Sequence, residues 1–139
     1  MNAEQIMLVQ SSWEELRPLA AKTGELLYRR VFELAPELRE RFSGTEREQG
    51  EAFMGMFGTA VDMLFRLDTL ETELRSLGRR HVAYGARPEY YRVFHEALIW
   101  TLERLLGAAF TADVRGAWDE VFGYIIKTMQ VAQREAEGA

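Results

Sequence analysis

Apolar residues recur at intervals of three and four along almost the whole chain, which is the period of one face of an α-helix. In the first segment they fall at Ile6, Val9, Trp13, Leu16 and Ala20. No stretch alternates apolar and polar residues between hairpin turns, as half-buried strands would. The pattern therefore predicts an all-α protein.

Prolines, glycines and polar capping residues divide this pattern into six or seven helices. We expect helices at about 4–20, 22–35, 36–42 and 46–67, and three more that begin after Asp68 or Thr69, at Pro88 and after Thr111. Asn2 and Gln5 have the spacing of a capping box at the first helix. The short connections predict a single domain over residues 1–139.

Two glycines lie inside the long helix expected at 46–67. Gly55 and Gly58 are three residues apart, so they fall on neighbouring parts of one helix face. Glycine lets another backbone approach closely, although it weakens a helix. We therefore expect a tight helix crossing at this pair.

Charge and composition exclude several classes of protein. The chain has 17 Lys and Arg against 22 Asp and Glu, a net charge of -5, which is the wrong sign for gripping a phosphate backbone. It has no cysteine, so disulfides and thiolate sites are excluded. No apolar run approaches the roughly 18 residues of a membrane span, and the first residues lack a secretory leader pattern. We expect a cytoplasmic protein with neither nucleic acid nor membrane as a partner.

Imidazole chemistry has to use one of two histidines, His81 or His95. His81 continues an apolar stripe formed by Leu70, Leu74 and Leu77. A histidine in such a position is more often a hydrogen-bonded core residue than a ligand. His95 follows an apolar helix position, and we interpret it as structural.

Several segments in register change the interpretation of His81. Gln49 lies 32 residues before His81, Phe42 seven before Gln49, and Tyr28 fourteen before Phe42. The segments are Leu26-Leu27-Tyr28-Arg29-Arg30-Val31-Phe32, Leu77-Gly78-Arg79-Arg80-His81-Val82-Ala83-Tyr84-Gly85, and Ala108-Ala109-Phe110-Thr111 with Ala117-Trp118. In order and spacing they resemble the second helix, the proximal-histidine helix and the last helix of the globin family. The resemblance covers about residues 4–132, and it is to bacterial single-domain globins and the globin domains of flavohaemoglobins, with neuroglobin also similar.

This resemblance implies a globin-like fold around haem b (iron protoporphyrin IX), with His81 as the iron ligand. Phe42 would pack against the haem edge, and Phe53 would stand over its distal side unless it is simply core. Tyr28 and Gln49 would donate hydrogen bonds to bound gas, unless the hydroxyl is bonded to backbone and the amide faces solvent. The full set of expected haem-site residues is His81, Phe42, Phe53, Tyr28, Gln49, Tyr91, Val82, Phe94 and Arg80.

The second nitrogen of a ligating imidazole needs an acceptor that fixes its tautomer. The resemblance gives this task to Tyr91, backed by a glutamate on the last helix, although Tyr91 also suits an ordinary core position. Gln133 stands in place of that glutamate here. A neutral amide supplies no negative charge, so the electronic push on the iron should be weaker. Arg80, Arg79 and Arg47 are candidates to pair with haem propionates, or form a solvated face.

The function implied is reversible binding of O₂ and other diatomic gases such as CO and NO. An alternative is nitric oxide dioxygenase activity, which would need a separate reductase because no flavin or nicotinamide segment is seen. A third is a gas-sensing or haem-less helical module, since a fold alone does not fix function. The sequence leaves the oligomeric state open.

Overall fold

The computed structural model describes residues 1–138, and within them all regular structure is helical. This confirms the all-α prediction. The elements in order are α1 (Ala3–Leu16), η1 (Arg17–Leu19), α2 (Ala20–Leu34), η2 (Pro36–Arg41), α3 (Glu46–Asp62), α4 (Leu67–Arg80), α5 (Pro88–Leu106), η3 (Gly107–Ala109) and α6 (Ala112–Glu137), where η denotes a short 3-10 helix.

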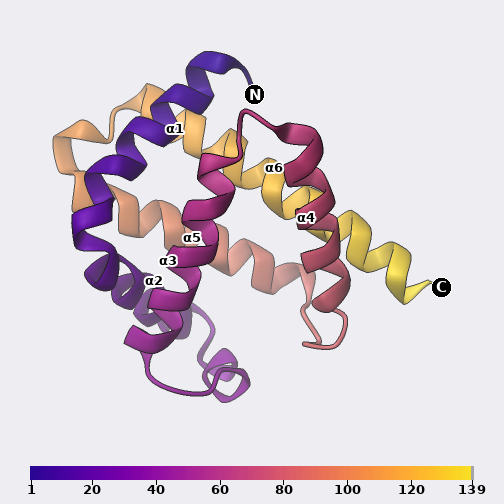
Figure 1. The fold of residues 1–139 in the computed structure, drawn as a ribbon. Coiled ribbons are helices and arrows are strands. Elements are labelled where there is room, and N and C mark those ends of the chain that lie inside the picture. Colours follow the sequence, from indigo (N-terminus) through magenta and orange to yellow (C-terminus); the bar gives the residue numbers. More distant parts are fainter. Residues whose placement is uncertain (139) are drawn as a thin grey trace.

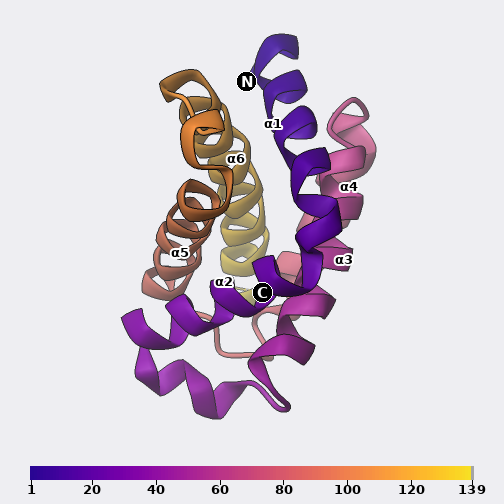
Figure 2. The same ribbon diagram turned by 90° about the vertical axis from the view of Figure 1, so that its left-hand side faces the viewer.

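The helices pack in two layers. Figure 2 shows α5 and α6 side by side on the left, with α1, α3 and α4 on the right and α2 crossing below. α3 packs mainly on α2, and α4 packs mainly on α6. α3 and α4 are antiparallel in chain direction. Both extend away from the short connection between them on the same side, and they diverge toward their other ends (Figure 1). This divergence separates the start of α3 from the end of α4.

Two of the expected helix starts are confirmed in detail. The Asn2 side chain accepts a hydrogen bond from the Gln5 backbone N–H at 2.9 Å, and the Gln5 side chain accepts one from Asn2 N–H at 3.0 Å. At α6 the Thr111 hydroxyl accepts from Val114 N–H at 3.3 Å. Each bond satisfies a backbone donor that a helix start leaves unpaired.

Other boundaries differ from the expectation. The first α-helix ends at Leu16, because Pro18 has no N–H to continue the ladder and lies in a 3-10 turn instead. α3 ends at Asp62, and α4 already begins at Leu67 with Arg66 as its uncapped N-cap residue. The prediction that Asp68 or Thr69 caps this helix was therefore wrong.

The tight helix crossing is real, but other glycines form it. A side chain placed on Gly24 of α2 would meet the backbone of Gly50 on α3 at 2.5 Å, and one on Gly50 would meet Gly24 at 2.3 Å. Gly55 has nothing within 4 Å, and Gly58 only lies beside the Trp13 ring. The expected crossing at Gly55 and Gly58 was therefore wrong, because those positions face solvent and a side chain rather than another backbone.

Candidate functional site

Four aromatic side chains from three helices and one loop gather beside the α2–α3 crossing. The Tyr28 ring lies 5.5 Å from Phe42, 6.2 Å from Phe53 and 5.6 Å from Phe94, measured between ring centroids. Phe53 and Phe94 also stack on each other at 6.4 Å. We call these four residues the aromatic cluster. All four had been expected in the haem site, and the structure brings them together.

Tyr28 is the one polar member of this cluster, and it is only 5% exposed. Its hydroxyl has no hydrogen-bond partner among residues 1–138. Burial raises the pKa of Tyr28 to about 12, because the anion would lose hydration. The group therefore stays a protonated O–H donor at neutral pH. The expected alternative of a hydroxyl bonded to backbone is not what the structure contains.

Gln49 lies in the first turns of α3, one turn before Phe53. Its amide Nε2 donates to the carbonyl oxygen of Ser43, in the loop before α3. The amide donor thus engages the protein backbone rather than Tyr28. In this conformation one of the two Gln49 amide N–H donors is held by the loop backbone, so the structure does not show Tyr28 and Gln49 acting as a joint pair of donors.

His81 is the C-cap residue of α4, directly after its last helical residue, and its side chain is partly buried. Its Nδ1 lies 2.8 Å from the carbonyl oxygen of Leu77, four residues earlier in the last helical turn. With Nδ1–H as the donor, Nε2 is the unprotonated nitrogen, and it has no partner among the described residues. Burial lowers the pKa of His81, the Leu77 carbonyl opposes this shift, and the Arg80 charge adds to it. Both the tautomer and the neutral charge are those of a metal-ligating imidazole.

Tyr91 does not accept the His81 N–H, so this sequence prediction was wrong. Its ring stacks on the His81 ring at 5.9 Å, and its hydroxyl donates to Gln133 Oε1 at 2.5 Å. Gln133 Nε2 in turn donates to the Ala86 carbonyl at 2.7 Å. Ala86 N–H donates to the His81 carbonyl at 3.2 Å. These contacts close a ring around His81, which we call the proximal ring.

The aromatic cluster and the proximal ring share α5. Tyr91 and Phe94 are three residues apart on this helix, so they lie on one face. The flanking helices α3 and α4, which carry Gln49 and His81, diverge on either side, as Figure 1 shows. Haem is a flat, mostly apolar group whose iron takes a neutral imidazole nitrogen. An unpartnered imidazole nitrogen, the unpartnered hydroxyl of a largely buried tyrosine and neighbouring aromatic rings fit such a group.

The remaining expected residues lie at the margin of this region. Val82 and Arg80 flank His81, and both are exposed. Arg47 pairs with Glu51 at 3.4 Å on the surface of α3. His95 Nε2 lies 3.1 Å from Asp119 on α6, which agrees with its structural interpretation.

No helix within residues 1–138 is long and apolar enough to cross a membrane.

Sequence reasoning missed three groups at this site: the Leu77 and Ser43 carbonyls and the Tyr84 ring. Tyr84 packs its edge against His81, with ring centroids 5.1 Å apart. The Leu77 contact had a sequence signal, because residues four apart share a helix face and carbonyls in a last turn lack intrahelical partners. The Ser43 contact had none.

Comparison with known proteins agrees with this geometry. A model of the globin family matches residues 25–129. The neuroglobin of Tetraodon nigroviridis is 32% identical over 136 residues, covering 88% of this chain and 86% of the relative. The neuroglobins of Danio rerio and Chaenocephalus aceratus are each 31% identical with the same coverage.

The chain belongs to the globin family. It is a haem-binding globin that binds O₂ and other gases. The finer expectation, a likeness to bacterial single-domain globins and flavohaemoglobins, is not supported by these vertebrate relatives.

Proposed function

We propose that this globin holds haem b through His81 Nε2 and binds diatomic gas in the space beside Tyr28. The observation that carries the proposal is the state of His81. Its Nδ1 is tied to the Leu77 carbonyl, which leaves Nε2 as a free electron pair. Its lowered pKa keeps that pair available at neutral pH. Haem, when bound, would supply a ferrous iron with one open coordination position for gas.

The chain's own residues then decide which ligands are held and for how long. Tyr28 presents an O–H donor from a buried position, and a hydrogen bond to a polar ligand there is worth on the order of 1 to 3 kcal/mol. Such a donor favours O₂, whose bound form is polarised, over CO. Phe53 and Phe94 pack within 6.4 Å of each other and limit the space to small ligands.

The remaining haem contacts in the proposal come from the other expected residues. Phe42 would pack on the edge of the ring, and Val82 beside His81 would contact its proximal side. Tyr91 would hold the orientation of the imidazole through its stacked ring. Arg80 is the candidate partner of a propionate, because it is exposed next to His81 and has no carboxylate partner among residues 1–138.

Oxygen storage or transport is the role we propose first. Nitric oxide dioxygenation, with electrons from a separate reductase, is the enzymatic alternative for the same residues. Nitrate formation from NO under continuous reduction, at a rate that falls in Tyr28→Phe, would support the enzyme. O₂ uptake that reverses when the gas is removed, without steady nitrate formation, would support the carrier.

Haem uptake by two histidine variants tests the proposal directly. Purified apoprotein titrated with hemin should give a Soret band that shifts when the reduced form is exposed to CO. His81→Ala should abolish or grossly weaken that band. His95→Ala is the matched control and should bind hemin as the parent does, since His95 pairs with Asp119. Equal uptake by the parent and His81→Ala would overturn the assignment.

A further inference from the structure

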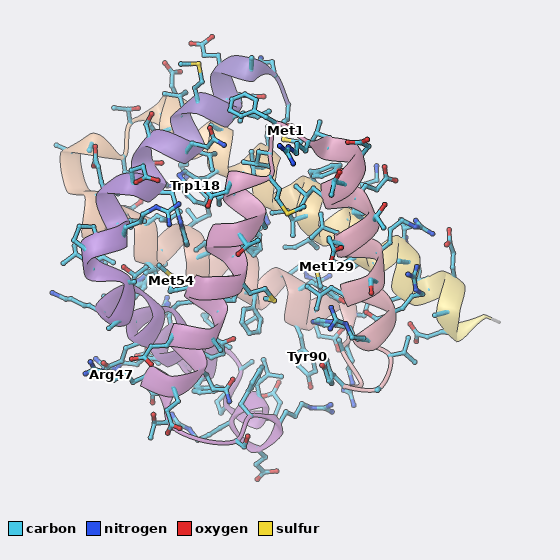
Figure 3. The ribbon with its side chains drawn as sticks, in the orientation of Figure 1. Met1, Arg47, Met54, Tyr90, Trp118 and Met129 are labelled. Carbon is cyan, nitrogen blue, oxygen red and sulfur yellow. The ribbon has the colours of Figure 1, made fainter. Side chains whose placement is uncertain are left out.

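Positive charge is concentrated around His81 in a chain that is acidic overall. Residues 75–92 contain five arginines and one glutamate, a net charge of +4, whereas the whole chain carries -5. This segment comprises the end of α4, the turn that follows it and the first residues of α5. The turn projects at the lower right of the molecule in Figure 1, and Tyr90, next to it at the start of α5, is labelled in Figure 3.

The arginines of this segment are largely free of carboxylate partners. Arg79, Arg80, Arg87 and Arg92 are exposed, and none forms an ion pair with another residue of the described chain. Only Arg75 is paired, with Glu135. Several arginines elsewhere are paired, and Arg29 contacts both Glu25 and Glu46. These four positive charges are therefore not used in ion pairs with other residues of the described chain.

Arg41, from η2, adds to this charge from across the loop. Its guanidinium donates to the Tyr84 carbonyl at 3.0 Å and lies 5.5 Å from the Tyr90 ring. Arg87 lies 5.8 Å from the same ring. These contacts use carbonyls and aromatic faces, which leaves both positive charges uncompensated. They also hold the two arginines in place, which reduces the entropy lost when a partner binds.

Two apolar side chains lie at the centre of this charged region. Tyr84 is 60% exposed and Val82 is 38% exposed. The Tyr84 ring contacts the His81 ring edge-on at 5.1 Å. An exposed aromatic group is thus in direct contact with the side chain that we propose binds iron. Apolar centres with charged rims are typical of protein interfaces.

We propose that Arg41, Arg79, Arg87 and Tyr84 form a docking surface, the proximal basic surface, for an acidic one-electron carrier protein. The proposal rests on the proposed function, because the electron is delivered to haem iron. One electron passes from the reduced carrier to ferric iron, giving ferrous iron and the carrier oxidised by one electron, with no bond made or broken. Gas binding requires the ferrous form, so a globin whose iron oxidises needs such a supply.

The charge on this surface fits a carrier with a negative face. Opposite charges steer two proteins together and raise the association rate, an effect that salt screens. The contact between Tyr84 and His81 gives the docked carrier a short route to the iron.

Reduction kinetics of the haem-loaded full chain test the proposal. The probe is an acidic flavodoxin in its hydroquinone form, mixed with ferric protein in a stopped-flow instrument. The second-order rate constant should fall steeply with ionic strength, and the double variant Arg79→Glu with Arg87→Glu should lower it about tenfold or more at low salt. Reduction by dithionite should be unchanged in that variant, because a small reductant does not need the surface.

Two cations outside the surface provide the matched control. Lys22 and Arg66 are exposed and lack carboxylate partners among residues 1–138, and Arg66 lies at the opposite end of α4. Lys22→Glu with Arg66→Glu changes net charge by the same amount and should leave most of the rate intact. Equal losses in the two double variants would overturn the proposal, because the effect would then follow net charge alone.

Binding without electron transfer gives a second readout. Oxidised flavodoxin added to ¹⁵N-labelled protein should perturb amide signals of residues 79–90 in the parent and not in the Arg79→Glu, Arg87→Glu variant. Binding of this surface to phosphatidylglycerol vesicles but not to flavodoxin, or self-association through it, would overturn the proposal. Failure to take up hemin would instead overturn the proposed function, so the two failures are distinguishable.

Discussion

Tyr91 and Gln133, 42 residues apart, are joined by a 2.5 Å hydrogen bond in which the tyrosine hydroxyl donates to the amide oxygen. The amide nitrogen of Gln133 is thereby left to donate to the Ala86 carbonyl. A glutamine is suited to this position because it carries an acceptor and a donor on one side chain. A glutamate has acceptors only, so it cannot form both bonds when ionised.

We expect Gln133→Glu to destabilise the apoprotein by about 1 to 3 kcal/mol at neutral pH, because the Ala86 carbonyl loses its donor and a buried carboxylate faces it. Urea unfolding at pH 7 measures this. Gln130→Glu, one turn earlier on α6 and only partly buried, should change stability far less. If both variants unfold at the same urea concentration, the bridge does not contribute to stability.

Tyr28→Phe should speed O₂ dissociation by about ten- to a hundredfold, since it removes a buried O–H donor worth 1 to 3 kcal/mol. CO dissociation should change much less, because bound CO accepts hydrogen bonds weakly. Stopped-flow ligand replacement measures both rates on haem-loaded protein. An unchanged O₂ rate would mean that this hydroxyl does not reach the ligand.

Gln49→Leu should speed O₂ dissociation less than Tyr28→Phe does. The Gln49 amide donates to the Ser43 carbonyl. If the amide turns toward a bound ligand, it loses this hydrogen bond, so the net stabilisation of the ligand is smaller. The same replacement experiment compares the two variants. A larger effect at Gln49 than at Tyr28 would show that the amide leaves Ser43 when gas is bound.

Gly24→Ala should destabilise the protein by about 1 to 3 kcal/mol or more, because the added methyl group would overlap the Gly50 backbone and push α2 from α3. Gly55→Ala is the matched variant in a helix with open space around it. It should stabilise by about 0.5 to 1 kcal/mol. Thermal or urea unfolding of both variants measures this contrast, and a stabilising Gly24→Ala would contradict the crossing.

Alkaline pH should weaken the fold through two tyrosines. Burial raises the pKa of Tyr28 to about 12, and burial together with the Glu137 charge raises that of Tyr91 to about 12. The ordinary value, near 10, applies to the unfolded chain. The folded state holds these protons more tightly than the unfolded chain does. The two protonated tyrosines therefore make their full contribution to the free energy of unfolding below pH 10, and that contribution is lost between pH 10 and 12.

The ultraviolet absorbance of ionised tyrosine, followed as the apoprotein is titrated, checks this expectation. The parent should show tyrosines that ionise near pH 12, and Tyr28→Phe should show one fewer. Complete ionisation of all tyrosines near pH 10 in folded protein would contradict the buried placement of Tyr28 and Tyr91.

The sequence was sufficient for features that depend on local spacing. Helical periodicity predicted the all-α fold, and capping chemistry predicted the starts at Asn2 and Thr111. The resemblance to globins implied that Tyr28, Phe42 and His81 belong to one site, and Tyr28 and Phe42 do lie together. The roles of these residues toward haem, and the cytoplasmic location, stay predictions.

Contacts between distant segments were beyond the sequence argument. Gly55 and Gly24 look alike in a sequence, and only the packing of α2 on α3 decides which one meets a backbone. The acceptor for His81 was assigned to Tyr91 when it is the Leu77 carbonyl. The sequence shows that a histidine can donate a hydrogen bond, but which acceptor it meets depends on the atoms that the fold brings near it.

If Tyr28 and Gln49 face bound gas as proposed, the contact between Gly24 and Gly50 also limits how gas affinity can be tuned. Tyr28 follows Gly24 by one helical turn, and Gln49 directly precedes Gly50, so two backbones in contact fix the frame that carries both side chains. Moving either helix to widen or narrow the gas site would break this contact at once. Changes in affinity are thus left to side-chain chemistry at positions such as 28 and 53, while the spacing of the helices stays constant.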